Sequence, residues 1–372
     1  MQLPCLKQRS LSLLLLSCLL IVSIFESNTR VQSLVLPKNV KVPALLAFGD
    51  SIIDPGNNNN LRTLVKCNFS PYGRDYDGGK PTGRFSNGKI PTDLIAKVLG
   101  IKENVPAYLD PNLKTDDLLT GVSFASGGAG YDPLTSKLVG VIGLSGQLKL
   151  FKEYIETLKA YIGEDTANSI ISDSLYIVIA GSDDIANTYY GTPVRKYKYD
   201  VHAYTDLMVQ HACNFVQELY NLGARRIGVF GITPLGCVPS QRTFHGGILR
   251  ECGEKVNKAA IMFNSKLSST LDEFNNKLVG GKAVYVDAFN PFLDIITNYH
   301  SYGFEVATRG CCGTGTFEVS FLCNKLNPVT CEDASDYVFW DSYHPTQKAY
   351  EQLLYPVMEK LSQSLFCSSF PC

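Results

Sequence analysis

Short apolar runs alternate along the chain with longer amphipathic segments. Each of the short runs ends near Gly, Ser or Asp, which predicts buried strands, whereas the longer segments carry apolar residues at helical spacing with charges on one side. The predicted strands lie at 42–47, 121–125, 175–180, 226–231 and 283–287, and the predicted helices at 148–162, 204–222 and 254–278. Such alternation predicts an α/β fold, a three-layer α/β/α sandwich with a central parallel sheet.

A serine directly follows the first apolar run. The stretch Phe48-Gly49-Asp50-Ser51-Ile52-Ile53-Asp54 leads into Pro55, Gly56 and four consecutive asparagines, which predict a loop. Because ligands bind at the carboxyl ends of parallel strands, Ser51 is a candidate nucleophile. Taken alone, an Asp-Ser pair before a turn is more often ordinary turn chemistry.

A second motif, near the other end of the chain, contains the partners that a nucleophilic serine requires. Asp341 precedes His344 by three residues, and Pro345 fits the first position of a helix predicted at 347–362. This arrangement predicts His344 at the exposed amino end of the helix, with Asp341 within reach of its ring, as a serine hydrolase requires. The other histidines have neither an aspartate three residues earlier nor a proline directly after them. They are His202, His211, His245 and His300.

Together the two motifs resemble those of the GDSL esterase/lipase family, also called SGNH hydrolases, and in particular its plant secreted branch. Four further segments also resemble family segments, and they occur in the family's order along the chain. They are 121–130, 179–184, 231–237 and 309–313. The stretch from Gly181 to Tyr189 is most similar to the extracellular-lipase subgroup. The resemblance covers nearly the whole mature chain, and it implies a flavodoxin-like sandwich and the hydrolysis of carboxylic esters without a cofactor.

The motifs and the resemblance lead to a set of expected roles. Ser51 is the nucleophile, His344 the general base and then acid, and Asp341 the residue that fixes the imidazole tautomer. The oxyanion hole is expected to use the backbone N–H groups of Ser51 and Gly127, with the side chain at position 183 as a third donor. The structural alternative for Gly127 is a flexible turn.

Position 183 departs from the family pattern. The family usually has asparagine where this chain has Asp183, and an ionised carboxylate can only accept hydrogen bonds. Either Asp183 is protonated, or the hole works with two backbone donors, or the protein is a weak enzyme.

The amino-terminal segment predicts secretion. Lys7 and Arg9 precede an apolar run from Leu11 to Phe25, which is 15 residues long. A membrane-spanning helix usually needs about 20 apolar residues, whereas the core of a signal peptide needs about 7 to 15. We therefore expect a signal peptide over residues 1–33, a single hydrolase domain over 34–372 without a low-complexity linker, and no transmembrane segment in the mature chain. An uncleaved anchor is the alternative.

The cysteines and one sequon agree with an extracellular protein. Ten of the 12 cysteines follow the predicted signal peptide, and a cluster of them is expected to contain at least one disulfide. The clustered residues are Cys311, Cys312, Cys323 and Cys331. A zinc site is the alternative, but the chain has no Cys-x-x-Cys pair, so no metal or other cofactor is expected. The sequon Asn68-Phe69-Ser70 predicts a glycan on Asn68.

The charge of the chain argues against nucleic acid as a partner. The formal net charge is −1, and no basic stripe is present. The glycine-rich turn at 127–130 matches neither a dinucleotide-binding nor a Walker pattern, which disfavours nucleotides. The expected function is that of a secreted esterase acting on lipid or small acyl esters. An acyltransferase with the same residues, and a binding protein on a degraded hydrolase scaffold, are the alternatives.

Overall fold

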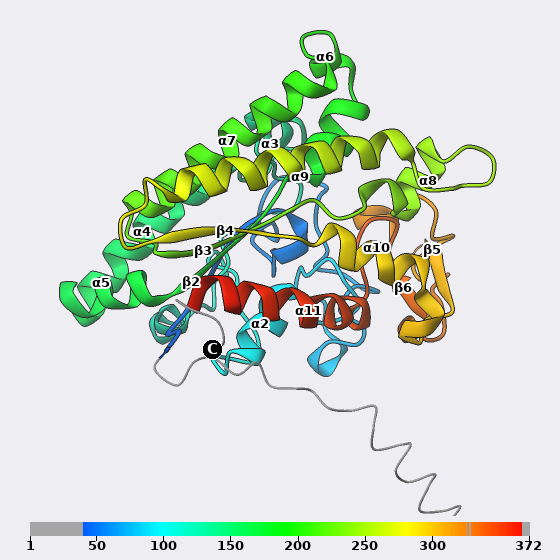
Figure 1. Cartoon of the computed structure of the whole chain (residues 1–372). Helices are drawn as coiled ribbons and strands as arrows, with labels where there is room; N and C mark the ends of the chain where they lie inside the picture. Colours follow the sequence, from blue (N-terminus) through cyan, green and yellow to red (C-terminus); the bar gives the residue numbers. More distant parts are fainter. Residues whose placement is uncertain (1–39, 325, 327–328, 367–372) are drawn as a thin grey trace, which may run out of the picture. The chain divides into compact units, whose positions relative to one another are not determined.

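A four-stranded parallel sheet forms the centre of the protein in the computed structural model, which describes residues 40–324, 326 and 329–366 (Figure 1). Its strands are β1 (Leu45–Gly49), β2 (Leu175–Ile179), β3 (Arg226–Phe230) and β4 (Lys282–Val286), in this spatial order. Ala47 lies opposite Ile177 in the β1–β2 pair, and Val178 lies opposite Val229 in the β2–β3 pair. Nearly all residues of the two middle strands are buried, as expected for a sheet that is covered on both faces.

Helices cover both faces of the sheet (Figure 1). The helices α4 (Leu144–Ile162), α7 (Val201–Asn221) and α9 (Glu254–Asn275) pack together on one face, and α2 (Pro91–Val98) and α11 (Gln347–Phe366) pack on the other. In α9 the buried side chains recur every three to four residues, at Val256, Phe263, Leu267 and Leu271 among others. The predicted three-layer α/β/α architecture is confirmed.

The remaining elements lie around this sandwich. They are α3 (Pro133–Val139), α5 (Glu164–Asp173), a π-helix (Asp184–Tyr190), α6 (Pro193–Lys196), α8 (Pro239–His245) and α10 (Phe289–Thr297). A second, two-stranded parallel sheet consists of β5 (Val306–Gly310) and β6 (Tyr337–Phe339). This sheet was not predicted, because β5 contains the exposed polar residues Thr308 and Arg309 instead of a continuous apolar run and β6 has only three residues.

The prediction of a strand at 121–125 was wrong in its extent. Only two isolated bridges form there, from Ser123 to Ala47 and from Ser123 to Ala107. Backbone hydrogen bonds from Ala47 N–H to Val122 at 3.2 Å and from Phe124 N–H to Ala47 at 2.8 Å still hold this segment beside β1. The carboxyl end of the segment, where Gly127 lies, therefore reaches the same edge of the sheet as Ser51.

The prediction for the start of α11 also needs a correction. The helix begins at Gln347, so Pro345 is not its first residue. Thr346 caps the helix by accepting a hydrogen bond from Ala349 N–H at its hydroxyl (3.3 Å), and Pro345 pairs with Phe339 in an isolated bridge. His344 consequently lies in the loop before the helix, and its side chain is buried instead of exposed.

Three disulfides occur among the described residues: Cys237–Cys252, Cys311–Cys331 and Cys312–Cys323. The last two confirm the prediction for the cysteine cluster. Cys67 and Cys213 are free thiols in the described part of the chain, whereas Cys367 and Cys372 lie outside it.

The predicted signal peptide, residues 1–33, lies outside the described residues. Among the helices that the structure does describe, none combines the length and the apolar character needed to cross a membrane.

Candidate active site

The end of β1 positions Ser51. Gly49, the last residue of the strand, has a φ of +143°, and a Cβ atom there would lie 1.7 Å from the carbonyl oxygen of Ile179 on β2. Only glycine allows this close approach of the two chains. Asp50 N–H then donates to that same carbonyl at 2.9 Å, and Ser51 starts a single 3₁₀ turn (Ser51–Ile53) in which Asp50 accepts a hydrogen bond from Ile52 N–H. The serine is thus held rigidly at the carboxyl edge of the sheet.

Ser51 and His344 are joined by a hydrogen bond, although 293 positions separate them. His344 Nε2 lies 2.7 Å from Ser51 Oγ. The other ring nitrogen, Nδ1, lies 3.0 Å and 2.9 Å from the two carboxylate oxygens of Asp341. The structure therefore brings the three predicted triad residues together in the order serine, histidine, aspartate.

Asp341 is completely buried and has hydrogen-bond donors on both carboxylate oxygens. Oδ1 accepts from the backbone N–H groups of Tyr343 (2.8 Å) and His344 (2.7 Å). Oδ2 accepts from the hydroxyl of Tyr72 at 2.7 Å. These donors fix the orientation of the carboxylate that lies against His344 Nδ1.

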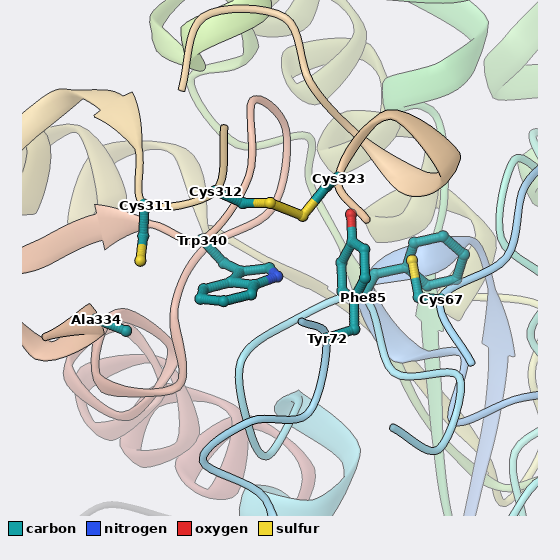
Figure 2. Close-up of a cluster of buried hydrophobic side chains, with 8 residues drawn as sticks. All are labelled: Cys67, Tyr72, Phe85, Cys311, Cys312, Cys323, Ala334 and Trp340. Carbon is teal, nitrogen blue, oxygen red and sulfur yellow. A yellow bond between two sulfur atoms is a disulfide. The ribbon is translucent and has the colours of Figure 1, made fainter. Parts of the chain in front are cut away.

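A cluster of buried rings surrounds the acid–histidine pair. Figure 2 shows Trp340, Tyr72 and Phe85 in this cluster, close to the Cys312–Cys323 disulfide. The ring of Phe85 packs on the ring of His344, with 5.1 Å between their centroids. A Cβ atom at Gly127 would lie 2.5 Å from Phe85 Cζ, so glycine is required at position 127 to leave room for the ring that supports His344.

The N–H of Gly127 has an acceptor within the protein. It donates to Asp54 Oδ2 at 2.9 Å, while Oδ1 of the same carboxyl accepts from Gly56 N–H (2.8 Å) and Asn57 N–H (2.7 Å). Burial raises the pKa of Asp54 to about 6, against the opposing effect of these donors. Gly127 thus lies next to the site, as predicted, but its N–H can reach an oxyanion only by sharing or leaving Asp54; its role there stays a prediction.

Asp183 is buried at the amino end of the π-helix. Its Oδ1 accepts a hydrogen bond of 2.5 Å from the side-chain amide of Asn187, and its Oδ2 has no partner among the described residues. Burial raises the pKa of Asp183 to about 6, whereas the charge of His344 and the Asn187 amide act in the opposite direction. π-Helices are rare and are often found at functional sites. Here the π-helix places Asn187 beside Asp183.

Asp50 is a second buried acid next to the nucleophile. Its Oδ1 accepts from Ile52 N–H at 3.0 Å, and its Oδ2 has no partner within the described chain. Burial and then the negative charge of Asp183 raise the pKa of Asp50 well above its usual range. The negative charge of Asp183 thus disfavours ionisation of Asp50, so the structure favours a protonated carboxyl at one of the two positions.

Asp184 has a structural role that differs from that of Asp183. Its carboxylate accepts hydrogen bonds from Tyr131 N–H (2.7 Å), Asp132 N–H (3.0 Å) and the Thr135 hydroxyl (2.5 Å). It therefore anchors the chain just after the glycine-rich turn at 127–130.

Three residues of the site were not found by sequence reasoning. Tyr72 and Phe85 carry no local signal, because their roles depend on contacts with Asp341 and His344 far along the chain. Asp54 had a signal: an acid placed three residues after Ser51 and before a turn of glycine and asparagines is suited to receive backbone N–H groups.

Comparison with known proteins agrees with this geometry. The family model for GDSL-like lipase/acylhydrolase matches residues 45–356. GDSL esterase/lipase EXL3 of Arabidopsis thaliana is 54% identical over 344 residues, which cover 92% of this chain and 93% of that protein. GDSL esterase/lipase At5g42170 of the same species is 55% identical over 316 residues, 85% of each chain. Because these matches span most of the chain, and the matched region contains both motifs that meet at the Ser51–His344 hydrogen bond, the chain belongs to the GDSL lipase/acylhydrolase family.

Proposed function

We propose that this serine esterase hydrolyses carboxylic esters with Ser51 as nucleophile, His344 as general base and acid, and Asp341 as the residue that orients the imidazole. Ser51 Oγ attacks the carbonyl carbon of the ester while His344 Nε2 takes the hydroxyl proton. The bond to the leaving alcohol then breaks as His344 returns the proton to it. A water molecule, activated by the same nitrogen, releases the acid from Ser51. The 2.7 Å separation of Ser51 Oγ and His344 Nε2 is the observation that carries this proposal.

For the oxyanion we propose donors from Ser51, Gly127 and position 183. None of the backbone hydrogen bonds that the described residues form outside helices and strands uses Ser51 N–H, which supports it as a free donor. Gly127 N–H donates to Asp54, which follows Ser51 by three residues. Because the pKa of Asp54 is about 6, this acid can take up a proton and so release the Gly127 N–H for the oxyanion. The unpartnered Oδ2 of Asp183 supports a carboxylic acid at this position that donates to the substrate oxygen.

A fluorophosphonate probe tests the nucleophile. We expect the folded wild-type protein to be labelled on the peptide that contains Ser51, and we expect Ser51→Ala to lose both the label and the turnover of short-chain esters. Heat-denatured wild type is the control for non-specific labelling. A label on a different serine, or undiminished turnover by Ser51→Ala, would contradict the assignment. Repeating the ester assay with added glycerol distinguishes hydrolysis from acyl transfer.

We also propose that the protein is secreted as a single domain over 34–372 and carries a glycan on Asn68. The three disulfides support an oxidising compartment. Asn68 is exposed and lies in a segment without regular secondary structure, where an oligosaccharide can be accommodated. Amino-terminal sequencing of protein recovered from the medium of a eukaryotic host tests the cleavage near Ser33; an intact amino terminus would favour the uncleaved anchor.

A further inference from the structure

An apolar cavity of about 40 Å³ lies at the carboxyl edge of the sheet, against the segments that carry the triad. Part of its wall comes from residues next to the triad in the sequence, namely Ile52, Tyr343 and Pro345. The rest comes from the carboxyl ends of β2 and β3, from the segments that follow these strands, and from α2, α10 and α11. It includes Ala288, which directly precedes α10, and Phe292, Leu353 and Leu354. The cavity thus occupies the space between the reactive edge of the sheet and the helices that cover it.

The electrostatic surroundings of two wall residues also place the cavity near the reactive groups. The ring of Tyr350 lines the cavity, and its hydroxyl has no partner among the described residues. Burial, Asp341 and Asp50 raise the pKa of this hydroxyl, so both acids lie within electrostatic range of it. Tyr343 is affected in the same way by burial, Asp183 and Asp50. The ring of Tyr343 also packs on the ring of His344, with 5.6 Å between their centroids, so this side of the cavity borders the triad. The remaining wall is mainly apolar.

The chemistry of the wall selects an apolar occupant. Leu353, Leu354 and Phe292 are nearly inaccessible to solvent and offer no hydrogen-bond partners. Water could find a polar partner in the Tyr350 hydroxyl, but it finds none along these three side chains, where an alkyl chain gains by leaving water. A water molecule needs about 10–15 Å³ of such a cavity, so 40 Å³ corresponds to about three waters, or to roughly three to four carbon atoms.

Resting on the Ser51 chemistry proposed above, we propose that this cavity binds the alkyl chain of the acyl group and selects short, unbranched acyl chains. The acyl carbonyl lies at Ser51, and the chain passes Ile52 and Tyr343 to reach the aliphatic wall formed by α10 and α11. Chains that extend beyond the cavity must displace Leu353 or Leu354, which are held in the packed layer between α11 and the sheet. The preferred acyl group therefore has about three to four carbons beyond the carbonyl.

The experiment compares kcat/KM for 4-nitrophenyl acetate, butyrate and octanoate in the wild type and in two cavity variants. Leu354→Ala enlarges the cavity, and Ala288→Val fills it. We expect the wild type to prefer butyrate to acetate and to octanoate. Leu354→Ala should raise the octanoate-to-butyrate ratio about tenfold or more, and Ala288→Val should lower the butyrate-to-acetate ratio by a similar factor, because a single methylene group is worth about 10- to 200-fold in an apolar pocket.

Leu361→Ala is the matched control. Leu361 lies on the same helix and is as deeply buried as Leu354, but it packs near Gly228 and does not line the cavity. Its removal should lower the melting temperature while both ratios stay at their wild-type values. Ratios are compared because they do not depend on the fraction of correctly folded enzyme, and Ala288→Val keeps the test decisive if Leu354→Ala does not fold.

The outcomes separate this proposal from the one on which it rests. Wild-type ratios in both cavity variants, with wild-type protein that hydrolyses the acetate ester, would overturn the acyl cavity and leave the esterase intact. Wild-type protein that is folded but neither hydrolyses any of the three esters nor reacts with the fluorophosphonate would overturn the Ser51 chemistry itself. A wild-type preference for octanoate would also overturn the short-chain assignment.

Discussion

The hydroxyl of Tyr72 donates a 2.7 Å hydrogen bond to Asp341 Oδ2, across 269 positions of the chain. The same hydroxyl accepts a hydrogen bond of 2.8 Å from the backbone N–H of Ser320, in the loop that the Cys312–Cys323 disulfide closes. The early polar loop and the disulfide loop thus meet at the acid that holds His344. We assign Tyr72 as a positioning residue for the triad.

Changing Tyr72 to phenylalanine tests this assignment. The substitution keeps the ring in the buried cluster and removes one donor from a buried carboxylate, an interaction of about 1.5–3 kcal/mol. We expect kcat to fall roughly ten- to hundredfold with little change in KM, since the substrate does not contact Tyr72. Tyr302→Phe is the matched control, because it removes a Tyr–Asp hydrogen bond on the exposed Asp294. An unchanged kcat in folded Tyr72→Phe would show that the donors on Oδ1 suffice.

The triad itself predicts strongly non-additive effects. Ser51→Ala and His344→Ala should each reduce kcat by several orders of magnitude, and the double variant should be hardly worse, because the residues act as a unit. Asp341→Asn should cost on the order of 10⁴-fold through the wrong imidazole tautomer. Steady-state kinetics on one soluble ester gives kcat for all four variants. If the losses of the single variants multiplied in the double variant, the residues would not act together.

The side chains of Ser51 and His344 are both buried in the structure. Their exposed fractions are 6% and 3%. His344→Ala therefore removes a buried ring that packs on Phe85 and leaves Asp341 with one donor fewer. Thermal unfolding should show a lower melting temperature for His344→Ala than for Ser51→Ala.

The covalent modifications give a prediction that does not depend on catalysis. Protein secreted from a eukaryotic host should carry a glycan on Asn68, and intact-mass spectrometry before and after glycosidase treatment measures it. The same protein should have no more than two alkylatable thiols without reduction, because Cys67 and Cys213 are the free cysteines of the described chain. An unmodified Asn68 or additional reactive thiols would argue against passage through the secretory pathway.

The sequence predicted those parts of the molecule that depend on local pattern. Four apolar runs became the strands of the sheet, because a strand buried on both faces must be apolar throughout. The Asp341–His344 spacing placed acid and base within a single turn, so their contact was readable without the fold. The contacts of Tyr72 with Asp341 and of Gly127 with Asp54 join separate loops, and no periodicity encodes them.

Buried acids predict an unusual dependence of stability on pH. Burial raises the pKa of Asp54 and Asp183 to about 6 and that of Asp184 to about 7, above the ordinary value of about 3.8. These groups keep their protons longer in the folded state, so the stability they contribute is present below about pH 4 and is lost as the pH rises toward 7. We expect the melting temperature to fall between pH 4.5 and 7.5, and to fall less in Asp183→Asn. A melting temperature that rises over this interval would contradict the raised pKa values.

The protonation state of Asp183 also decides how it can act on the oxyanion. An ionised carboxylate repels the negative charge that develops on the substrate oxygen, whereas a protonated one donates a hydrogen bond, as asparagine does at this position in the family. Activity should rise with pH as His344 loses its proton and fall as Asp183 loses its own. The alkaline fall should lie near the pKa of about 6 to which burial raises the Asp183 carboxyl.

Replacing Asp183 with asparagine should therefore remove the part of the alkaline fall that the ionisation of Asp183 causes. The amide keeps the size of the carboxyl, can still accept the Asn187 hydrogen bond through its oxygen, and retains a donor that cannot ionise. Above the fall, turnover should exceed that of the wild type by up to about 10²–10³-fold, the effect of one oxyanion-hole donor. The measurement is the pH–rate profile of both proteins on one short-chain ester. Superimposable profiles would exclude Asp183 from the oxyanion hole. Asn187→Ala would then test whether the exposed side-chain amide of Asn187, beside Asp183, is the third donor. Loss of that donor should lower kcat without moving either limb of the pH–rate profile.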